Sequence, residues 1–186
     1  MPIATPTARS LLAREDSVLL VIDAQERLLP AIAERPKVVA NIVRLVKFAR
    51  IIDLPVLFSE QQKLGATVEE IRSEVPGFNA VSKLSFDCFG SPEFNDRVEK
   101  LGRRSLILTG AEAHICVAQT AISGLARYTV HAVSDATSSR SLHNRDIALE
   151  RMRQCGVIIT STEMVIYELL REAGTDEFKA ALPLVK

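Results

Sequence analysis

The stretch that decides the fold is Ser17-Val-Leu-Leu-Val-Ile22, which is followed directly by Asp23. Five consecutive residues of this stretch are apolar, so a strand built from them presents apolar side chains on both of its faces. Such strands are typical of the centre of a parallel sheet that is covered by helices on both sides. We therefore predict a central parallel strand with a carboxylate at its carboxyl end.

Strands and helices are predicted to alternate along the rest of the chain. Short runs rich in Val, Ile and Leu predict strands at 56–59, 80–83, 105–109, 128–133 and 157–160. Segments of helical period predict helices at 37–52, 92–101, 116–127 and 144–154, a short helix near 67–73, and a closing helix from 161 or 162 to about 172. Residues 134–139 are predicted to form a polar loop. This pattern predicts an α/β fold, a three-layer α/β/α sandwich with a six-stranded, mainly parallel, Rossmann-like sheet.

The length of the chain sets its domain organisation. Its 186 residues fit one domain, and we expect an N-terminal arm at 1–16 followed by a single domain at 17–186. The arm carries Arg9 and Arg14 and no acid before Glu15, which gives it a faint likeness to a transit peptide. We favour an arm that packs on the body or on a neighbouring subunit. No apolar run approaches the roughly 18 residues of a membrane-spanning helix, so no membrane partner is expected.

Charge and cysteine content exclude further classes. Lys plus Arg and Asp plus Glu both number 23, which gives a formal net charge of zero. This balance lacks the basic footprint of a nucleic-acid binder, so no nucleic-acid partner is expected. The three cysteines are an odd number and show no C-x-x-C spacing. We therefore expect reduced thiols and a cytoplasmic protein.

The residues at the strand ends point to the chemistry, because open parallel sheets bind ligands at the carboxyl ends of their strands. The segment after the first strand, Asp23-Ala-Gln-Glu-Arg-Leu-Leu-Pro30, contains no glycine. It therefore lacks both the dinucleotide fingerprint and the phosphate-binding loop, and we expect no cofactor. It offers the carboxylate of Asp23 instead, which can transfer protons or simply cap a loop.

A cysteine near the end of a second central strand can supply a nucleophile. Cys116 lies at the start of a predicted helix, where backbone N–H groups favour the thiolate. The alternative is a small buried apolar residue. If the first and fourth strands are neighbours in the sheet, Asp23 and Cys116 share one crevice. Lys83 would then enter this crevice from the third strand and hold both groups electrostatically.

Three motifs together resemble a known family. They are Asp23-x-Gln25 after an apolar strand, Lys83 before an aromatic-rich loop, and Gly110-Ala-Glu-Ala-His-Ile-Cys116. In order and spacing, over nearly all of the chain from Ser17 onward, they resemble the isochorismatase-like cysteine hydrolase superfamily. Further segments resemble its subgroup of YcaC and isochorismatase domain-containing proteins, namely Ser59-Glu-Gln61, 134–141 and 151–156.

This resemblance implies a specific site. It implies a catalytic triad of Asp23, Lys83 and Cys116, and a non-proline cis peptide near Ala111-Glu112. The backbone N–H groups of Glu112 and Cys116 would then form an oxyanion hole. We also expect a homo-oligomer. The residues expected to contact a small-molecule substrate are Gln25, Phe86 and His114.

The chemistry of these residues agrees with what the resemblance implies. Asp23 can take the thiol proton while Cys116 attacks a carbonyl, and backbone donors can hold the oxyanion. A leaving amine and then a hydrolytic water can exchange protons with Asp23, which resolves a thioester. We therefore predict a metal-independent cysteine hydrolase, an amidohydrolase acting on a small amide-like C–N bond.

Departures from the family pattern keep two alternatives open. Nicotinamidases of the superfamily place an Asp-x-His metal pair after the second strand, whereas this chain has Glu60-Gln-Gln-Lys-Leu-Gly65; no metal is expected. True isochorismatases lack the nucleophilic cysteine, so Cys116 argues against isochorismate as the substrate. A nicotinamidase and a catalytically idle oligomeric or binding module remain the alternatives. Of the other thiols, Cys88 is a possible pocket neighbour and Cys155 is predicted to lie in the core.

Overall fold

The computed structural model describes residues 11–186. Most of the predicted N-terminal arm, residues 1–10, lies outside the described residues. The remainder of the arm packs on the body of the domain. The Leu12 N–H donates to the Glu168 carboxylate at 3.0 Å, and Arg14 pairs with Glu177 at 2.8 Å.

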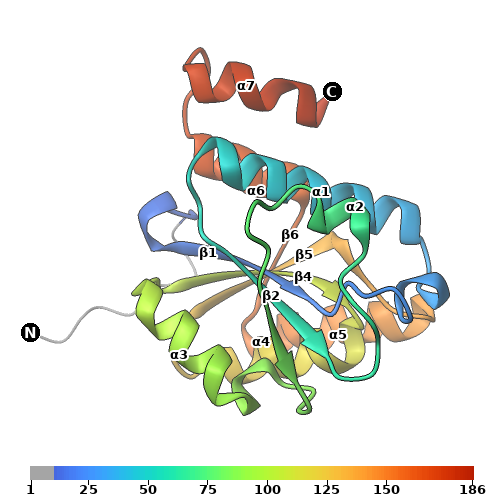
Figure 1. Ribbon diagram of the computed structural model, residues 1–186. Helices are drawn as coiled ribbons and strands as arrows, with labels where there is room; N and C mark the ends of the chain where they lie inside the picture. Colours follow the sequence, from blue (N-terminus) through green and yellow to red (C-terminus); the bar gives the residue numbers. More distant parts are fainter. Residues whose placement is uncertain (1–10) are drawn as a thin grey trace, which may run out of the picture.

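A six-stranded parallel sheet forms the middle of the molecule (Figure 1). Its spatial order is β3-β2-β1-β4-β5-β6, and every neighbouring pair is parallel. The strands are β1 (Ser17–Ile22), β2 (Val56–Gln61), β3 (Ala80–Lys83), β4 (Ser105–Ala111), β5 (Thr129–Ser138) and β6 (Ile158–Thr160). The predicted α/β class and sheet are therefore confirmed, with β1 at the centre beside β4.

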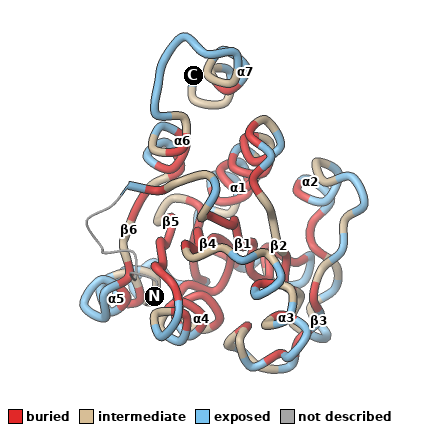
Figure 2. Tube along the Cα trace, turned by 90° about the vertical axis from the view of Figure 1, so that its left-hand side faces the viewer, coloured by how far each residue is buried: buried red, intermediate tan, exposed pale blue. Residues whose placement is uncertain are grey.

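Helices cover both faces of the sheet and complete the three-layer sandwich (Figures 1 and 2). One face carries α1 (Arg35–Ile51) and α6 (Thr162–Leu170), with the short α2 (Glu69–Arg72) beside α1 and α7 (Asp176–Val185) outermost. The other face carries α3 (Pro92–Leu101), α4 (Ala118–Gly124) and α5 (Leu142–Cys155). None of the helices within residues 11–186 has the length and apolar character needed to cross a bilayer.

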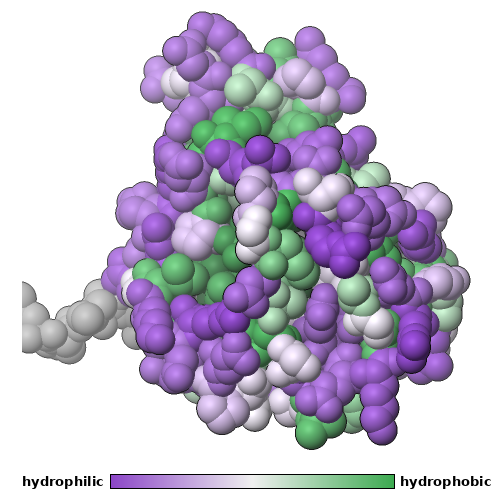
Figure 3. Space-filling view, viewed as in Figure 1, coloured by the Kyte–Doolittle hydropathy of each residue, from purple (hydrophilic) through white to green (hydrophobic). Residues whose placement is uncertain are grey.

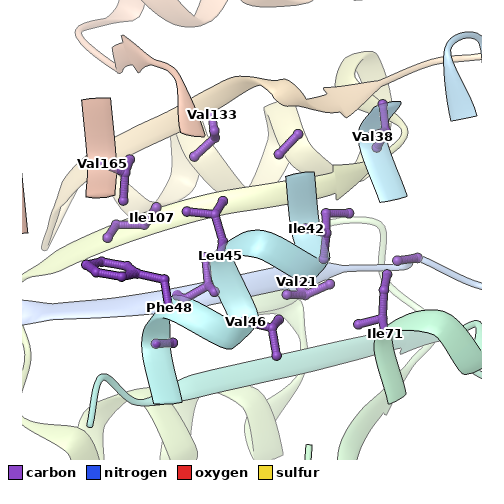
Figure 4. Packing of buried hydrophobic residues seen from close by; sticks show 14 of the residues in the cluster. Val21, Val38, Ile42, Leu45, Val46, Phe48, Ile71, Ile107, Val133 and Val165 are labelled. Atoms are coloured by element: carbon purple, nitrogen blue, oxygen red, sulfur yellow. The ribbon is translucent and has the colours of Figure 1, made fainter. Parts of the chain in front are cut away.

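Side chains of β1 alternate between two apolar cores, one on each face of the sheet. Leu19 and Val21 belong to the core under α1, whereas Leu20 and Ile22 belong to the core against α3, α4 and α5. Figure 4 shows the first core, where residues of the sheet such as Val21 meet α1. This two-sided burial is the physical reason for the uninterrupted apolar run.

Two local predictions need correction. The predicted polar loop at 134–139 is largely strand, because β5 continues to Ser138. Thr137 pairs with Gly110 and Ser138 with Ala111 after a register shift, and both β5 residues are fully buried. The predicted helix at 116–127 is in fact a π-helical turn, η4 (Ala113–Val117), followed by the shorter α4.

The helix predicted to close the chain is not the last one. Ser161 caps α6 as predicted, since its hydroxyl accepts from the Met164 N–H. The chain then forms α7, which Thr175 caps in the same way, and this helix rests on α1 and α6. Figure 3 shows apolar surface where α7 meets these helices. Ala181 is the one α7 residue that is buried, while the larger apolar side chains of the helix, Phe178, Leu182, Leu184 and Val185, are partly exposed.

Candidate active site

The candidate site lies where β1 and β4 run side by side, at the point where the strand order reverses. Asp23 follows β1 with a positive φ of 49°, a conformation that is uncommon for residues other than glycine. Gly110 on β4 pairs with Ile22 and has a φ of 110°. A Cβ at this glycine would lie 1.9 Å from the Ile22 carbonyl oxygen. Glycine therefore allows β4 to approach β1 closely, directly beside Asp23.

The Asp23 carboxylate accepts hydrogen bonds from two donors, one on β2 and one on β3. Lys83 Nζ at the end of β3 donates to Oδ2 at 2.7 Å, and Ser59 Oγ on β2 donates to Oδ1 at 2.7 Å. The side chains of Asp23 and Lys83 have no solvent-exposed surface. A buried pair of this kind needs such additional hydrogen bonds, because both charges have lost their hydration.

Lys83 is held as a cation by acceptors on all sides. Besides Asp23, Nζ lies 2.9 Å from Gln61 Oε1, 3.2 Å from the Ser85 carbonyl and 3.3 Å from the Phe86 carbonyl. Burial alone would lower the pKa of Lys83, but the Asp23 carboxylate and the other neighbours outweigh it and the pKa is raised. Lys83 therefore supplies a permanent positive charge at neutral pH.

Cys116 lies in η4, just beyond β4, and is 6% exposed. Burial and then the neighbouring Asp23 carboxylate raise the pKa of the Cys116 thiol, while Lys83 opposes them less strongly. The expectation that a helix N-terminus favours the thiolate is therefore wrong for the resting protein. The raised pKa instead indicates a neutral thiol, which is hydrogen-bonded to the Asp23 carboxylate that can accept its proton.

The Ala111-Glu112 peptide bond is cis, as the resemblance implies. It joins β4 to η4, so the backbone of Glu112 and of Cys116 belongs to the turn that carries the thiol. The Glu112 side chain points elsewhere: its carboxylate receives the Arg140 backbone N–H at 2.9 Å and pairs with the Arg140 guanidinium at 3.1 Å.

The three residues expected to contact substrate lie in different environments. Phe86 is 52% exposed, on the loop that follows Lys83. His114 is half-buried, and its Nδ1 lies 2.9 Å from Ser139 Oγ. Gln25 is fully buried, and its amide bonds the backbone of Gln61 and Gly65. Its side chain therefore holds a loop and has no free polar atom to offer a substrate.

The other two cysteines differ from each other. Cys88 is buried, with Sγ 3.6 Å from Ser59 Oγ. Burial raises the pKa of the Cys88 thiol to about 11, so this thiol stays protonated. Cys155 is exposed at the last turn of α5. Its predicted place in the core is wrong, because α5 buries Ala148 and Met152 instead.

Sequence reasoning singled out Ser59 and Gln61 only as part of a resemblance, and missed their contacts with the charged pair. Both lie on β2, next to β1, in the part of the strand that reaches its carboxyl end. Ser59 directly follows the apolar residues 56–58 and Gln61 comes two residues later. This position is the one available signal, because serine and glutamine side chains are as common in loops as at sites.

Two cavities flank this region. One of about 260 Å³ is lined by Asp87, His114, Ala118, Gln119, Ile122, Ser123 and Arg151. The other, of about 480 Å³, lies beside Gln61 and is lined by Arg27, Glu60, Gln61, Gln62, Lys63, Gly65 and Ser82.

Across residues 11–186, no group of three or more His, Cys, Asp or Glu side chains has the arrangement needed to hold a metal ion. At the position of the nicotinamidase metal pair, the Glu60 carboxylate accepts from Thr67.

The family model for the isochorismatase domain matches residues 17–164. The chain belongs to the isochorismatase family. It is 37% identical to isochorismatase domain-containing protein 2A of Mus musculus, across 96% of this chain and 88% of that protein. Members of this superfamily are generally cysteine hydrolases.

Solved structures share the fold of this isochorismatase-family chain. The MAR1 ribonuclease from Caenorhabditis elegans superposes with a TM-score of 0.88 at 33% identity, covering 95% of this chain and 92% of that one. The YcaC gene product from Escherichia coli, described as an octameric hydrolase of unknown specificity, gives a TM-score of 0.85 at 25% identity. The superposition covers 93% of this chain and 91% of YcaC.

Proposed function

We propose that this protein is a metal-independent cysteine hydrolase that cleaves a small amide-like C–N bond with a triad of Asp23, Lys83 and Cys116. The observation that carries the proposal is the fully buried Asp23–Lys83 pair beside the buried Cys116 thiol. Buried charges are costly unless they are paired, and they concentrate at sites that need them.

The proposed reaction has two halves. In the first, Sγ of Cys116 bonds to the substrate carbonyl carbon while its proton moves to Asp23. The oxyanion is held by the backbone N–H groups of Glu112 and Cys116. The C–N bond then breaks, and the leaving nitrogen takes the proton from Asp23. In the second half, water gives a proton to Asp23 and attacks the thioester, and Sγ leaves with that proton.

Lys83 is proposed to act as a fixed charge rather than as a proton donor. Its Nζ lies within 3.3 Å of four oxygen acceptors. Its positive charge pairs with the Asp23 carboxylate before the attack and stabilises the negative charge that develops on Sγ during it.

Assembly, location and substrate contacts belong to the same proposal. The octameric YcaC neighbour supports a homo-oligomer. The three free cysteines agree with a reduced, cytoplasmic setting. Phe86 and His114 remain the proposed substrate contacts, because Phe86 is exposed beside Lys83 and His114 lines the 260 Å³ cavity.

Cleavage of RNA, which the name of the C. elegans neighbour suggests for that protein, is less well supported in this chain. The formal net charge is zero, and binding to a phosphate backbone needs a concentration of basic side chains. A nucleophilic residue that is only 6% exposed suits a small substrate better than a polymer.

A panel of small amides, ureas and imides, with nicotinamide included, tests this function. We expect the wild-type protein to release ammonia or an amine from at least one compound. A transient acyl adduct on Cys116 should be visible by rapid quench and intact-mass analysis. Cys116→Ala should lose turnover by about 10³-fold or more, because no other group replaces the nucleophile.

The exposed thiol provides the matched control, since Cys155→Ala should keep wild-type turnover. Full turnover by Cys116→Ala would exclude the proposed mechanism. A complete lack of turnover would favour the idle module. Hydrolysis of nicotinamide together with stoichiometric metal, measured by plasma mass spectrometry, would favour the nicotinamidase.

A further inference from the structure

We infer that Ser59 is a positioning residue, which aims the Asp23 carboxylate at the Cys116 thiol and is itself oriented by Cys88. The inference rests on the proposed function, because it assigns Ser59 a part in the proton transfer from Cys116 to Asp23.

The first argument is the geometry at the carboxylate. Ser59 is 1% exposed and donates to Oδ1 at 2.7 Å, while Lys83 donates to Oδ2 at 2.7 Å. One donor on each oxygen, from two different strands, prevents rotation of the carboxylate about its Cβ–Cγ bond. With Lys83 alone, the carboxylate could pivot about a single contact.

The second argument is the direction of the Ser59 hydroxyl. A serine hydroxyl has one proton and can rotate it toward any acceptor. Cys88 Sγ lies 3.6 Å from Ser59 Oγ, and the Cys88 thiol keeps its proton because burial raises its pKa to about 11. Cys88 therefore acts as a weak donor to Oγ, which leaves the Ser59 proton for Asp23. The Cys88 thiol would thus orient the Ser59 hydroxyl without acting as a nucleophile.

The third argument is the requirement of proton transfer itself. The carboxylate must present a lone pair to the thiol within hydrogen-bond reach, and small errors in aim reduce the rate. Asp23 follows β1 at a positive φ, so its backbone places the side chain, and the donors Ser59 and Lys83 orient its oxygens. Loss of Ser59 should therefore slow the transfer without removing the base.

Acrylamide is a probe that needs no knowledge of the substrate. In its addition to Cys116, Sγ bonds to the terminal alkene carbon. The thiol proton passes through Asp23 to the carbon next to the carbonyl, and nothing leaves. Because the proton stays within the Asp23–Cys116 pair, the wild-type rate should be flat between about pH 6 and pH 8. Asp23→Asn should instead react through thiolate formed in bulk water, with a rate rising about tenfold per pH unit.

The inference is tested by measuring the rate of acrylamide addition in variants of Ser59, with adducts assigned to Cys116 by peptide mapping. The rate in Ser59→Ala should still not depend on pH, because Asp23 remains. It should be about tenfold lower than in wild type, because a hydrogen bond to a charged group is lost. Ser59→Thr retains the hydroxyl and should recover to within about threefold of wild type. The control is Ser17→Ala, which removes another fully buried hydroxyl, bonded to the Ala13 carbonyl at 2.7 Å, from the opposite end of β1. It should react at the wild-type rate.

Several outcomes would overturn the inference, and they separate it from the proposed function. The positioning role is excluded if Ser59→Ala reacts within twofold of the wild-type rate, or if its rate rises with pH. A flat wild-type profile would still support Asp23 as the base in either case. A folded Ser59→Thr that stays as slow as Ser59→Ala also overturns it. A wild-type profile that rises like that of Asp23→Asn overturns the proposed function itself. If Ser59→Ala does not fold, Ser59→Cys takes its place, with an intermediate rate expected from its weaker donor.

Discussion

Single residues at the end of β1 control both the site and the stability of the sheet. Asp23 adopts a positive φ, and Gly110 lies against the backbone of Ile22. The same close approach that lets β4 carry Cys116 toward Asp23 leaves no room for a side chain at position 110. The pairing of β1 with β4 and the placement of Cys116 beside Asp23 therefore both depend on Gly110. In the sequence, Gly110 is recognisable only as the first residue of the motif that contains Cys116.

Gly110→Ala tests this close approach. A methyl group at this position would meet the Ile22 carbonyl oxygen at 1.9 Å, at a φ of 110°. We expect a loss of about 3 kcal/mol or more in the free energy of unfolding, or failure to fold. Urea denaturation followed by circular dichroism measures the change.

Gly77→Ala is the control, because Gly77 also has a positive φ, of 68°, but has open space around its Cβ position. It should cost only about 1 to 2 kcal/mol, from the left-handed backbone conformation alone. Equal losses in the two variants would show that backbone conformation, and not the contact with Ile22, decides the effect.

At the same scale, the sequence predicts some site residues better than others. Asp23, Lys83 and Cys116 are chemically distinctive groups at or just beyond strand ends, and the fold brings them together. Gln25 also follows a strand, but whether its amide bonds substrate or backbone depends on a loop 36 to 40 residues away. The contacts of Ser59 likewise become visible only when three strands are in place.

At the scale of elements, the apolar pattern predicts the strands but not where each one ends. β5 continues for five residues beyond Val133, into a polar segment that its pairing with β4 buries. Hydrogen bonds to a neighbouring strand, rather than apolar side chains, decide where this strand stops. The same limit applies to η4, since a π-helical turn has the composition of an ordinary helix start.

β5 also contains a histidine that makes stability depend on pH. His131 is 3% exposed, and burial lowers its pKa to about 4 from an ordinary value of 6.5. The folded protein therefore keeps His131 neutral where the unfolded chain already binds a proton. Stability is complete above about pH 6.5 and should fall by about 2 to 3 kcal/mol as the pH drops toward 4.

Urea denaturation at pH 7.5 and at pH 4.5 checks this, with His131→Gln and the exposed His143→Gln compared with wild type. The difference in unfolding free energy between the two pH values should shrink in His131→Gln alone. An unchanged difference in that variant would assign the acid sensitivity to other groups.

At the scale of the whole molecule, the surface beside the site is suited to self-association. Leu84 is 72% exposed and Phe86 is 52% exposed, on the loop that also supplies two carbonyl acceptors to Lys83. Exposed apolar side chains close together often mark an interface, and the formal net charge of zero offers little repulsion between copies.

We expect the protein to elute in size-exclusion chromatography with light scattering as a species larger than one chain, and Leu84→Glu to shift it toward smaller species. Met164→Glu changes a residue that is 52% exposed on α6 and should leave the assembly intact. A wild-type monomer at micromolar concentration would contradict the proposed assembly, and dissociation by Met164→Glu alone would place the interface on α6.

The strand order has a consequence for how the chain can be divided. β1 to β3 form one half of the sheet and β4 to β6 the other, and the two halves are joined through Gly102, an exposed turn residue after α3. A cut at this turn would leave Asp23, Ser59, Lys83 and Cys88 on one fragment and Cys116 on the other. Neither fragment alone would hold both a base and a nucleophile. A rate of acrylamide addition to Cys116 that does not change with pH would therefore show that the two fragments have reassembled. The protein would in this way serve as its own complementation assay.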